Sequence, residues 1–294
     1  MRRFVVTSLA AIVLGTTAIP AVANAGDTLY QNCIPSYQGC PEQLEDIDQY
    51  APHISRVMNY YLWSGGTAAA QDYIRQANAN GQKVIVMIDD AWSRTQLGNH
   101  VDAVKNLAGT WGYYLGDVGH ATPYPETIAN HDNVSKHPRV YIDKHSKVGQ
   151  ARTKALAASG DVEKIGYECF PIWTMSAQGA IAKSNPPFDY MDECGDMAAD
   201  AHDIGVRSRS VNGAFMVVQA FAFDDECAAE PDCAGPPPKR SGPYPTYSQQ
   251  CKERDVVTPN AVQILWFGAF FMTNNNWHGR LDKISRAAVD PNCD

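Results

Sequence analysis

The sequence predicts an α/β fold, a (β/α)8 or TIM barrel formed by a single domain. Short apolar runs rich in Val, Ile, Tyr and Phe alternate with helix-like segments, as in βα units around a parallel sheet. Eight such runs fall within about 270 residues, the usual size of this barrel. The competing doubly wound sheet needs a Gly-rich phosphate loop after its first strand, and Ser64-Gly65-Gly66 is too short to supply one.

The eight predicted strands are bounded by turn residues and are enriched in β-branched and aromatic side chains. They are Thr28–Tyr30, Arg56–Trp63, Lys83–Asp89, Trp111–Asp117, Arg139–Asp143, Lys164–Phe170, Gly213–Phe221 and Gln263–Met272. The first of these is the weakest. Between the strands, helices are predicted at Pro41–Tyr50, Thr67–Asn80, Thr95–Leu107, Gly149–Ala158, Asp189–Ile204 and Thr258–Val262.

Glycine marks the ends of two of these helices, because Asn80-Gly81 and Ser159-Gly160 offer the left-handed conformation that helix ends use. The segment Asp224–Pro259 is rich in Pro, Gly and Cys and is predicted to be a long irregular loop. Loops of this length inside a compact domain are usually functional or cross-linked, and its three cysteines favour a cross-linked one.

The first 25 residues are predicted to be a secretory signal peptide. Arg2 and Arg3 precede a short apolar run, and a small-residue ending at Ala23-Asn24-Ala25 follows. The run is shorter than the about 20 apolar residues that span a bilayer. The mature domain is then residues 26–294, exported to the periplasm or the medium.

The mature chain is acidic, with 22 Lys and Arg against 32 Asp and Glu, a formal charge of −10. It has no basic stripe, so nucleic acid and anionic membranes are poor partners. All eight cysteines lie in the mature part, and an even number in an exported chain indicates disulfides. Cys33 and Cys40 are close in sequence, as are Cys227 and Cys233, so each pair could form a disulfide that closes a short loop. The other pairings stay open.

Carboxylates, carboxamides and tryptophans recur where the predicted strands end, and these ends form the active-site rim of a barrel. The strand ends read Asn59-Tyr-Tyr-Leu-Trp63, Asp89-Asp90-Ala-Trp92, Gly116-Asp117-Val118, Asp143-Lys-His145, Glu168-Cys-Phe-Pro-Ile-Trp173, Gln219-Ala-Phe221 and Asn274-Asn-Asn-Trp277-His278. Glycosidic cleavage needs two carboxyl groups, one protonated and one ionised. The apolar faces of sugar rings pack on aromatic side chains. The combination therefore favours a carbohydrate-active site.

Several of these motifs resemble secreted TIM-barrel glycoside hydrolases that are distantly similar to clan A. The likeness covers residues 56 to 278 and rests on Trp111-Gly-Tyr-Tyr-Leu-Gly-Asp117, Tyr141-Ile-Asp143, Gly166-Tyr-Glu168-Cys-Phe-Pro171 and Val217-Val-Gln219-Ala-Phe221. In that family the fourth strand commonly reads Gly-Tyr-Tyr-x-Gly-Asp-Glu-Pro. This chain has Val118 and Gly119 in place of the last Glu and Pro, so the glutamate that the resemblance implies as proton donor is missing.

Asp117 and Glu168 are accordingly the predicted catalytic pair, with Asp90 as a third candidate. Asp89 and Asp90 are neighbours in sequence, so only one of them can face the barrel axis. Predicted substrate-binding residues are Trp63, Trp92, Asp143, Trp173, Gln219 and Trp277. A carboxamide such as Gln219 on an apolar strand needs a partner, because leaving it unpaired costs about 1–3 kcal/mol.

We therefore expect a secreted glycoside hydrolase that acts on a polysaccharide or oligosaccharide as a monomer, without metal or cofactor. Val118 keeps a second hypothesis open, a non-catalytic barrel of the same fold that only binds glycan. A metal-dependent or phosphodiester-cleaving barrel is disfavoured, because no His-x-His pair lies at a strand end.

Overall fold

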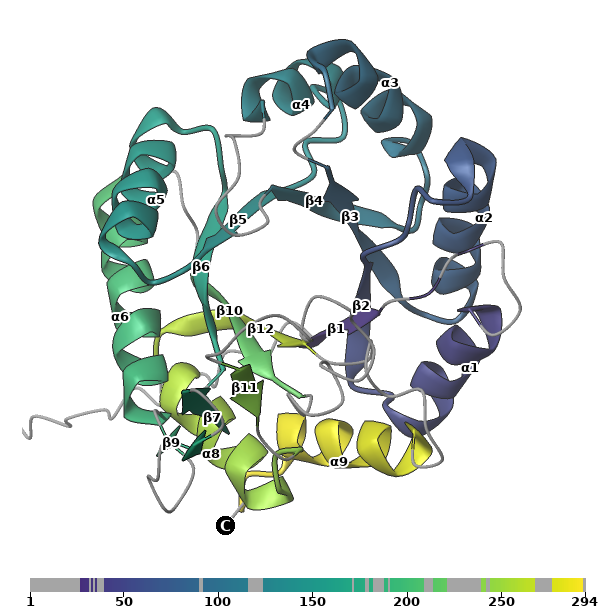
Figure 1. Cartoon of the computed structure of the whole chain (residues 1–294). Helices are drawn as coiled ribbons and strands as arrows, with labels where there is room; N and C mark the ends of the chain where they lie inside the picture. The colour runs from purple at the N-terminus through teal and green to yellow at the C-terminus, as the bar shows by residue number, and fades with distance from the viewer. Residues whose placement is uncertain are drawn as a thin grey trace, which may run out of the picture.

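The chain forms a closed barrel of parallel strands surrounded by helices (Figure 1). The computed structural model describes residues 27–31, 33, 35, 40–89, 92–115, 124–170, 191–208, 214–220, 244–267 and 277–292, together with the backbone of four short strands within 172–241. In this part of the chain eight parallel strands follow the order β1-β12-β10-β6-β5-β4-β3-β2, and β2 pairs with β1 to close the ring. The predicted (β/α)8 barrel is confirmed.

Each of the eight predicted strands corresponds to a barrel strand, with ends that differ by a few residues. The strands are β1 (Asp27–Gln31), β2 (Ile54–Asn59), β3 (Lys83–Ile88), β4 (Thr110–Leu115), β5 (Arg139–Asp143), β6 (Lys164–Cys169), β10 (Ala214–Gln219) and β12 (Ala261–Phe267). The apolar runs identified them because each strand is covered by helices on its outer face and by the opposite strands on its inner face.

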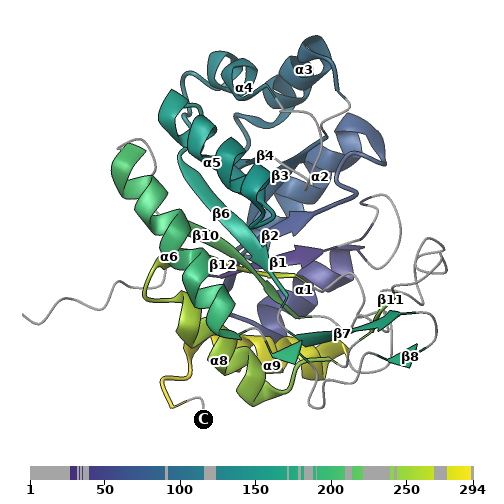
Figure 2. The same ribbon diagram turned by 60° about the vertical axis from the view of Figure 1, so that its left-hand side comes forward.

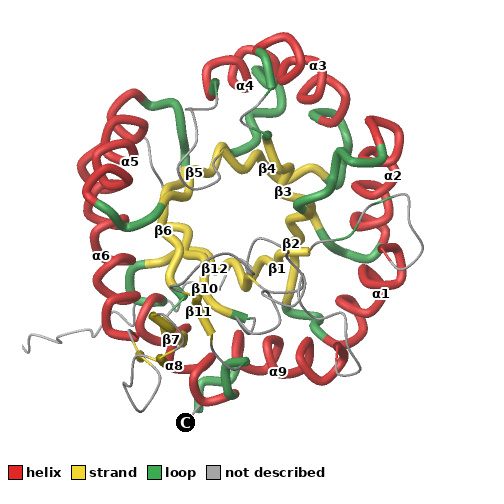
Figure 3. Tube along the Cα trace, viewed as in Figure 1, coloured by secondary structure: helices red, strands yellow, loops and turns green. Residues whose placement is uncertain are grey.

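Eight helices in the described ranges cover the outside of the barrel (Figure 3). They are α1 (Cys40–Tyr50), α2 (Gly66–Ala79), α3 (Arg94–Val104), α4 (Pro125–His131), α5 (Lys147–Ser159), α6 (Met191–Ser208), α8 (Tyr247–Val257) and α9 (Trp277–Val289). Five of them match predicted helices. Gly81 and Gly160 adopt φ values of 75° and 77° just past α2 and α5, so these two predicted helix ends are confirmed.

Two predictions near the C-terminal end are wrong. Residues 247–257 form helix α8, although they belong to the segment Asp224–Pro259 that was predicted to be irregular throughout. Residues Thr258–Val262 do not form a helix, because Thr258 caps α8 and β12 begins at Ala261. The missed signal is the capping box Thr246-x-x-Gln249, in which each side chain bonds the other residue's backbone N–H.

A small antiparallel sheet leaves the barrel after β6 and was not predicted. It consists of β7 (Ile172–Ala177), β8 (Ala180–Ile181), β9 (Phe188–Asp189) and β11 (Lys239–Ser241), with β7 pairing to the other three. Because β7 starts three residues after β6 ends, this sheet lies at the carboxyl end of the barrel strands (Figure 2).

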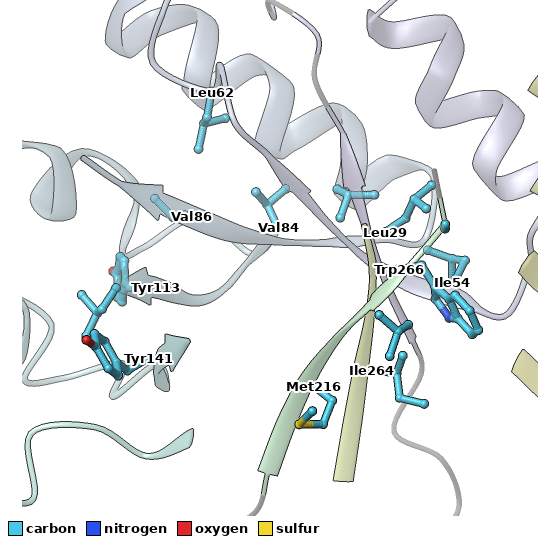
Figure 4. Packing of buried hydrophobic residues seen from close by; sticks show 14 of the residues in the cluster. Leu29, Ile54, Leu62, Val84, Val86, Tyr113, Tyr141, Met216, Ile264 and Trp266 are labelled. Atoms are coloured by element: carbon cyan, nitrogen blue, oxygen red, sulfur yellow. The ribbon is translucent and has the colours of Figure 1, made fainter. Parts of the chain in front are cut away.

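The core has two layers, set by the alternation of side chains along each strand. The outer cluster lies between the barrel and its helices, and Figure 4 shows Leu29, Val84 and Trp266 within it. The inner cluster fills the barrel with ten buried side chains, including Tyr30, Met87 and Val217. On β6 the inner position 166 is glycine, because a Cβ there would lie 1.6 Å from the carbonyl oxygen of Phe215.

Disulfides cross-link two loops on the carboxyl side of the strands. Cys33 bonds to Cys40, as predicted, and Cys169 at the end of β6 bonds to Cys194 in α6. Cys251 is also disulfide-bonded, while the predicted pair of Cys227 and Cys233 lies outside the described residues. Among the helices that the structure describes, none combines the length and hydropathy needed to cross a membrane.

Candidate active site

Glu168 lies near the carboxyl end of β6 in register with a barrel-lining residue. Its neighbours Tyr167 and Cys169 belong to the outer cluster, so the alternation of the strand directs position 168 to the barrel axis. Glu168 pairs with Val217 of β10, which is part of the inner cluster. The side chain is half-buried. A carboxyl group is therefore present at the active-site end of the barrel interior.

Gln219 follows on the neighbouring strand, one inward position nearer the mouth than Val217. It is fully buried, and its backbone N–H donates to Oε1 of Glu253 in α8, 2.7 Å away. Glu168 and Gln219 are thus diagonal neighbours on adjacent strands. The structure brings these two predicted site residues together.

Aromatic rings continue from these polar groups across the adjoining part of the mouth. Phe170 lies 5.4 Å from Phe267, Phe267 lies 4.4 Å from Tyr30, and Tyr30 lies 6.3 Å from Tyr60, measured between ring centroids. We call these four residues the mouth row. They come from the ends of β6, β12, β1 and β2, and the first three pack against the inner cluster. The row borders the position of Glu168.

The mouth row was not predicted. Its four members are far apart in sequence, and only the closing pairs of β1 with β12 and with β2 bring Tyr30 between Phe267 and Tyr60. The available signal was positional, because each ring occupies the last inward position of its strand or follows the strand directly.

Trp63 and Trp92 occupy a different place, against the outer cluster. Their rings are 5.6 Å apart, and each lies 4.2 Å from the ring of His100 in α3. The indole N–H of Trp63 donates to the carbonyl oxygen of Met87, 2.9 Å away. Burial lowers the pKa of His100, which favours the neutral ring between the two indoles. This cluster braces the loops after β2 and β3.

Asp143 ends β5 on the side that faces the helices. Its carboxylate is 1 % exposed and accepts two hydrogen bonds of 2.8 Å from Arg152 of α5. It also accepts from the hydroxyl of Tyr141 and the backbone N–H of Lys144, both at 2.7 Å. Burial opposes ionisation of Asp143, but these hydrogen bonds outweigh it and lower its pKa. The structure does not bring this carboxylate together with Glu168.

The other predicted site residues are not described by the structure, or are described only in their backbone. Asp90, Asp117 and Val118 lie outside the described residues. Trp173 and Trp277 have their backbone in β7 and α9, and their side chains are outside the described part.

Asp89 continues the inward alternation of Ile85 and Met87 and is exposed just beyond β3. It is therefore the acid of the Asp89-Asp90 pair whose position matches the barrel interior. Within the described ranges, no three His, Cys, Asp or Glu side chains group as metal ligands.

No family model matches the chain, and no curated protein sequence is similar to it. Solved structures are similar in fold. A candidate α-L-fucosidase from Bacteroides thetaiotaomicron matches with a TM-score of 0.56 and 12 % identity, covering 96 % of this chain and 99 % of that one. A GH5_18 protein from Bifidobacterium longum subsp. longum, in complex with Manβ1-4GlcNAc, matches with a TM-score of 0.59 and 14 % identity. The match covers 90 % of this chain and 77 % of that one.

The tryptophan synthase α-subunit from Pyrococcus furiosus also matches, with a TM-score of 0.51 and 10 % identity over 90 % of this chain and 98 % of that one. Glycoside hydrolases are prominent among the similar structures, yet a barrel with other chemistry is present too. At these identities the comparison establishes the TIM-barrel fold, and function has to be argued from the site.

Proposed function

We propose that this chain is an exported glycoside hydrolase that cleaves an oligosaccharide or polysaccharide. The observation that carries the proposal is the place of Glu168, a carboxyl group on the inward side of β6 at the barrel mouth, beside Gln219 and the mouth row. The disulfides of Cys33 with Cys40 and of Cys169 with Cys194 support export, since such bonds persist in oxidising compartments.

The chemistry needs a second carboxyl group on the other side of the scissile bond. Asp117, predicted at the end of the fourth strand, is our candidate. Asp89 takes the assisting role predicted for Asp90, because Asp89 continues the inward alternation of β3. Of the two catalytic carboxyl groups, one protonates the leaving oxygen and the other attacks the sugar or activates water. A separation of about 5–5.5 Å between them gives retention of configuration, and about 6.5–9.5 Å gives inversion.

Gln219 and the mouth row have the chemistry of a sugar-binding surface. A carboxamide is a side-chain group that both donates to and accepts from hydroxyl groups, and that of Gln219 lies buried beside Glu168. The half-buried rings of Phe170 and Phe267 offer apolar faces at the same mouth, and the buried ring of Tyr30 packs behind Phe267. Trp173 and Trp277 are proposed to extend this surface, whereas Trp63, Trp92 and Asp143 have the contacts of structural residues.

Val118 favours a second candidate function, a barrel that binds glycan without cleaving it. The resembling family places glutamate at that position, and valine cannot transfer a proton. Under this hypothesis the mouth row and Gln219 bind the ligand, and Glu168 serves only as a hydrogen-bond acceptor.

The decisive experiment is hydrolysis measured on a broad polysaccharide panel with the wild type and two variants, Glu168→Gln and Asp117→Asn. General acid–base groups contribute about 10²–10⁴-fold, so each variant is expected to lose at least about 10²-fold in kcat/KM. Glu45→Gln on the exposed side of α1 is the matched control and should retain full activity.

Retained hydrolysis in both site variants would refute the proposed carboxyl pair. Glycan binding without turnover by the wild type would select the second candidate, and hydrolysis gained by Val118→Glu would show that only the acid was missing.

A further inference from the structure

The end of β2 is fastened to the end of β1 by one buried side chain. Asn59 has no exposed surface, and its Nδ2 donates to the carbonyl oxygen of Cys33 at 2.8 Å. Its Oδ1 accepts from the backbone N–H groups of Cys33 and Tyr61, at 3.4 and 3.1 Å. A single carboxamide therefore holds the loop after β1 and the turn after β2 together.

Two further links make this junction rigid. The disulfide of Cys33 with Cys40 joins the loop after β1 to the first residue of α1, and Asn59 Nδ2 lies within 3.7 Å of both sulfur atoms. The backbone N–H of Tyr60 donates to the carbonyl oxygen of Gln31, at 3.0 Å. The backbone of Tyr60 is thus held by Gln31 and that of Tyr61 by Asn59, which fixes where the two side chains begin.

The rings held by this junction stay open to solvent. Tyr60 is 42 % exposed and Tyr61 36 % exposed, and their centroids are 5.3 Å apart with planes at 79°. Because Tyr60 also lies 6.3 Å from Tyr30, the rings run without a break from the inner cluster out to the rim.

Such a fixed, exposed pair is well suited to binding. Aromatic rings with a polar end bind ligands with little loss of side-chain entropy, more so where the backbone is already ordered. Packing alone would not need two exposed rings at the edge of an interior that is already filled by Tyr30 and Phe267.

We propose that Tyr60 and Tyr61 form an outer subsite for the sugar chain, so that the substrate is an extended chain of several units. One sugar unit lies at Glu168, and the following units cross the mouth row toward the rim between β1 and β2. This inference rests on the proposed carbohydrate function and adds to it the length and direction of the ligand. Tyr61 would then contact only the outer units of a longer chain.

The test is the dependence of kcat/KM, or of Kd where there is no turnover, on chain length. The probes are β-1,4- and β-1,3-linked gluco-, manno-, xylo- and N-acetylglucosamine oligosaccharides from dimer to hexamer. In the wild type the hexamer should exceed the dimer at least tenfold for one of these series. Tyr61→Ala should reduce that ratio at least tenfold, while Tyr61→Phe should keep most of it.

Tyr60→Ala provides a second variant with the same expected loss of ratio. Tyr124→Ala is the matched control, since Tyr124 is also 36 % exposed but precedes α4, where Arg94 packs 4.4 Å from its ring. Figure 1 shows α4 well away from β1 and β2 around the barrel. The control should keep the wild-type ratio.

Two other results would overturn the inference in distinguishable ways. If the wild type binds or cleaves glycans with no gain from chain length, or if Tyr61→Ala loses activity equally at every length, the outer subsite is refuted and the proposed function stands. If the wild type neither binds nor cleaves any glycan, the proposed function fails and the subsite fails with it.

Discussion

Asp27 begins the first barrel strand with its carboxylate buried against Trp266. The indole N–H of Trp266 donates to Oδ2 at 2.7 Å, and the residue is 8 % exposed. Burial raises the pKa of Asp27 from 3.8 to about 6, although the Trp266 hydrogen bond and the charges of Arg56 and Arg254 act against it. The folded protein therefore holds this proton more tightly than the unfolded chain does.

The resulting pH dependence has a definite sign. The stabilisation from the bound proton is fully present below pH 3.8 and is lost as the pH rises through about 6. Asn has no such titration and can still accept from the indole. Relative to wild type, Asp27→Asn should therefore gain roughly 3 kcal/mol of unfolding free energy between pH 3.5 and 7.5.

Urea unfolding of both proteins at several pH values checks this, with Asp48→Asn on the exposed side of α1 as the control. If the unfolding free energies of wild type and Asp27→Asn changed with pH in parallel, the prediction would be wrong.

At the same scale, strand periodicity predicts the positions of Glu168 and Gln219 near the barrel mouth, because each interrupts an apolar strand near its carboxyl end. Their roles stay predictions. Periodicity did not reveal that the carboxylate of Asp143 faces α5. Whether the odd- or the even-numbered residues of β5 point to the barrel axis is not fixed by the alternation alone. Periodicity also missed the mouth row, whose rings meet through strand pairing that no local pattern encodes.

At the scale of elements, α8 shows why the sequence pattern of a polar, cysteine-containing segment predicts a loop where the structure has a helix. Its sequence has little apolar periodicity, and its start depends on the reciprocal bonds of Thr246 and Gln249. The helix also supplies Glu253, which accepts from the backbone of Gln219. The position of Gln219 at the mouth therefore depends on α8.

Removal of this cap is predicted to destabilise the protein measurably. Thr246→Ala should lower the unfolding free energy by about 1 kcal/mol, the usual cost of losing an N-cap hydroxyl. Ser248→Ala, one residue into the exposed side of α8, removes a hydroxyl without a cap and should change it by less than about 0.5 kcal/mol. Chemical denaturation compares the two, and equal effects would count against the capping role.

For the whole molecule, the two described disulfides constrain the unfolded chain to different extents. Cys169 and Cys194 are 25 residues apart, and Cys33 and Cys40 are 7 apart. Loop-closure entropy gives about 3–4 kcal/mol for the longer loop and about 2–3 kcal/mol for the shorter. The double variant Cys169→Ala/Cys194→Ala should therefore be less stable than Cys33→Ala/Cys40→Ala.

Thermal unfolding of both double variants tests the order. Equal stability of the two double variants, or the reverse order, would mean that contacts in the folded state outweigh the entropy of the unfolded chain.

The pairing of β1 with β12 means that the barrel can close only late in folding. Thr28 lies opposite Leu265 and Leu29 opposite Trp266, so the first barrel strand in the sequence pairs with the last one. Until β12 arrives, β1 and β10 each present an unmatched row of peptide groups, the kind of edge on which chains aggregate. Because contacts of such long sequence separation form slowly, the period before closure is when a nascent or refolding chain has most need of a chaperone.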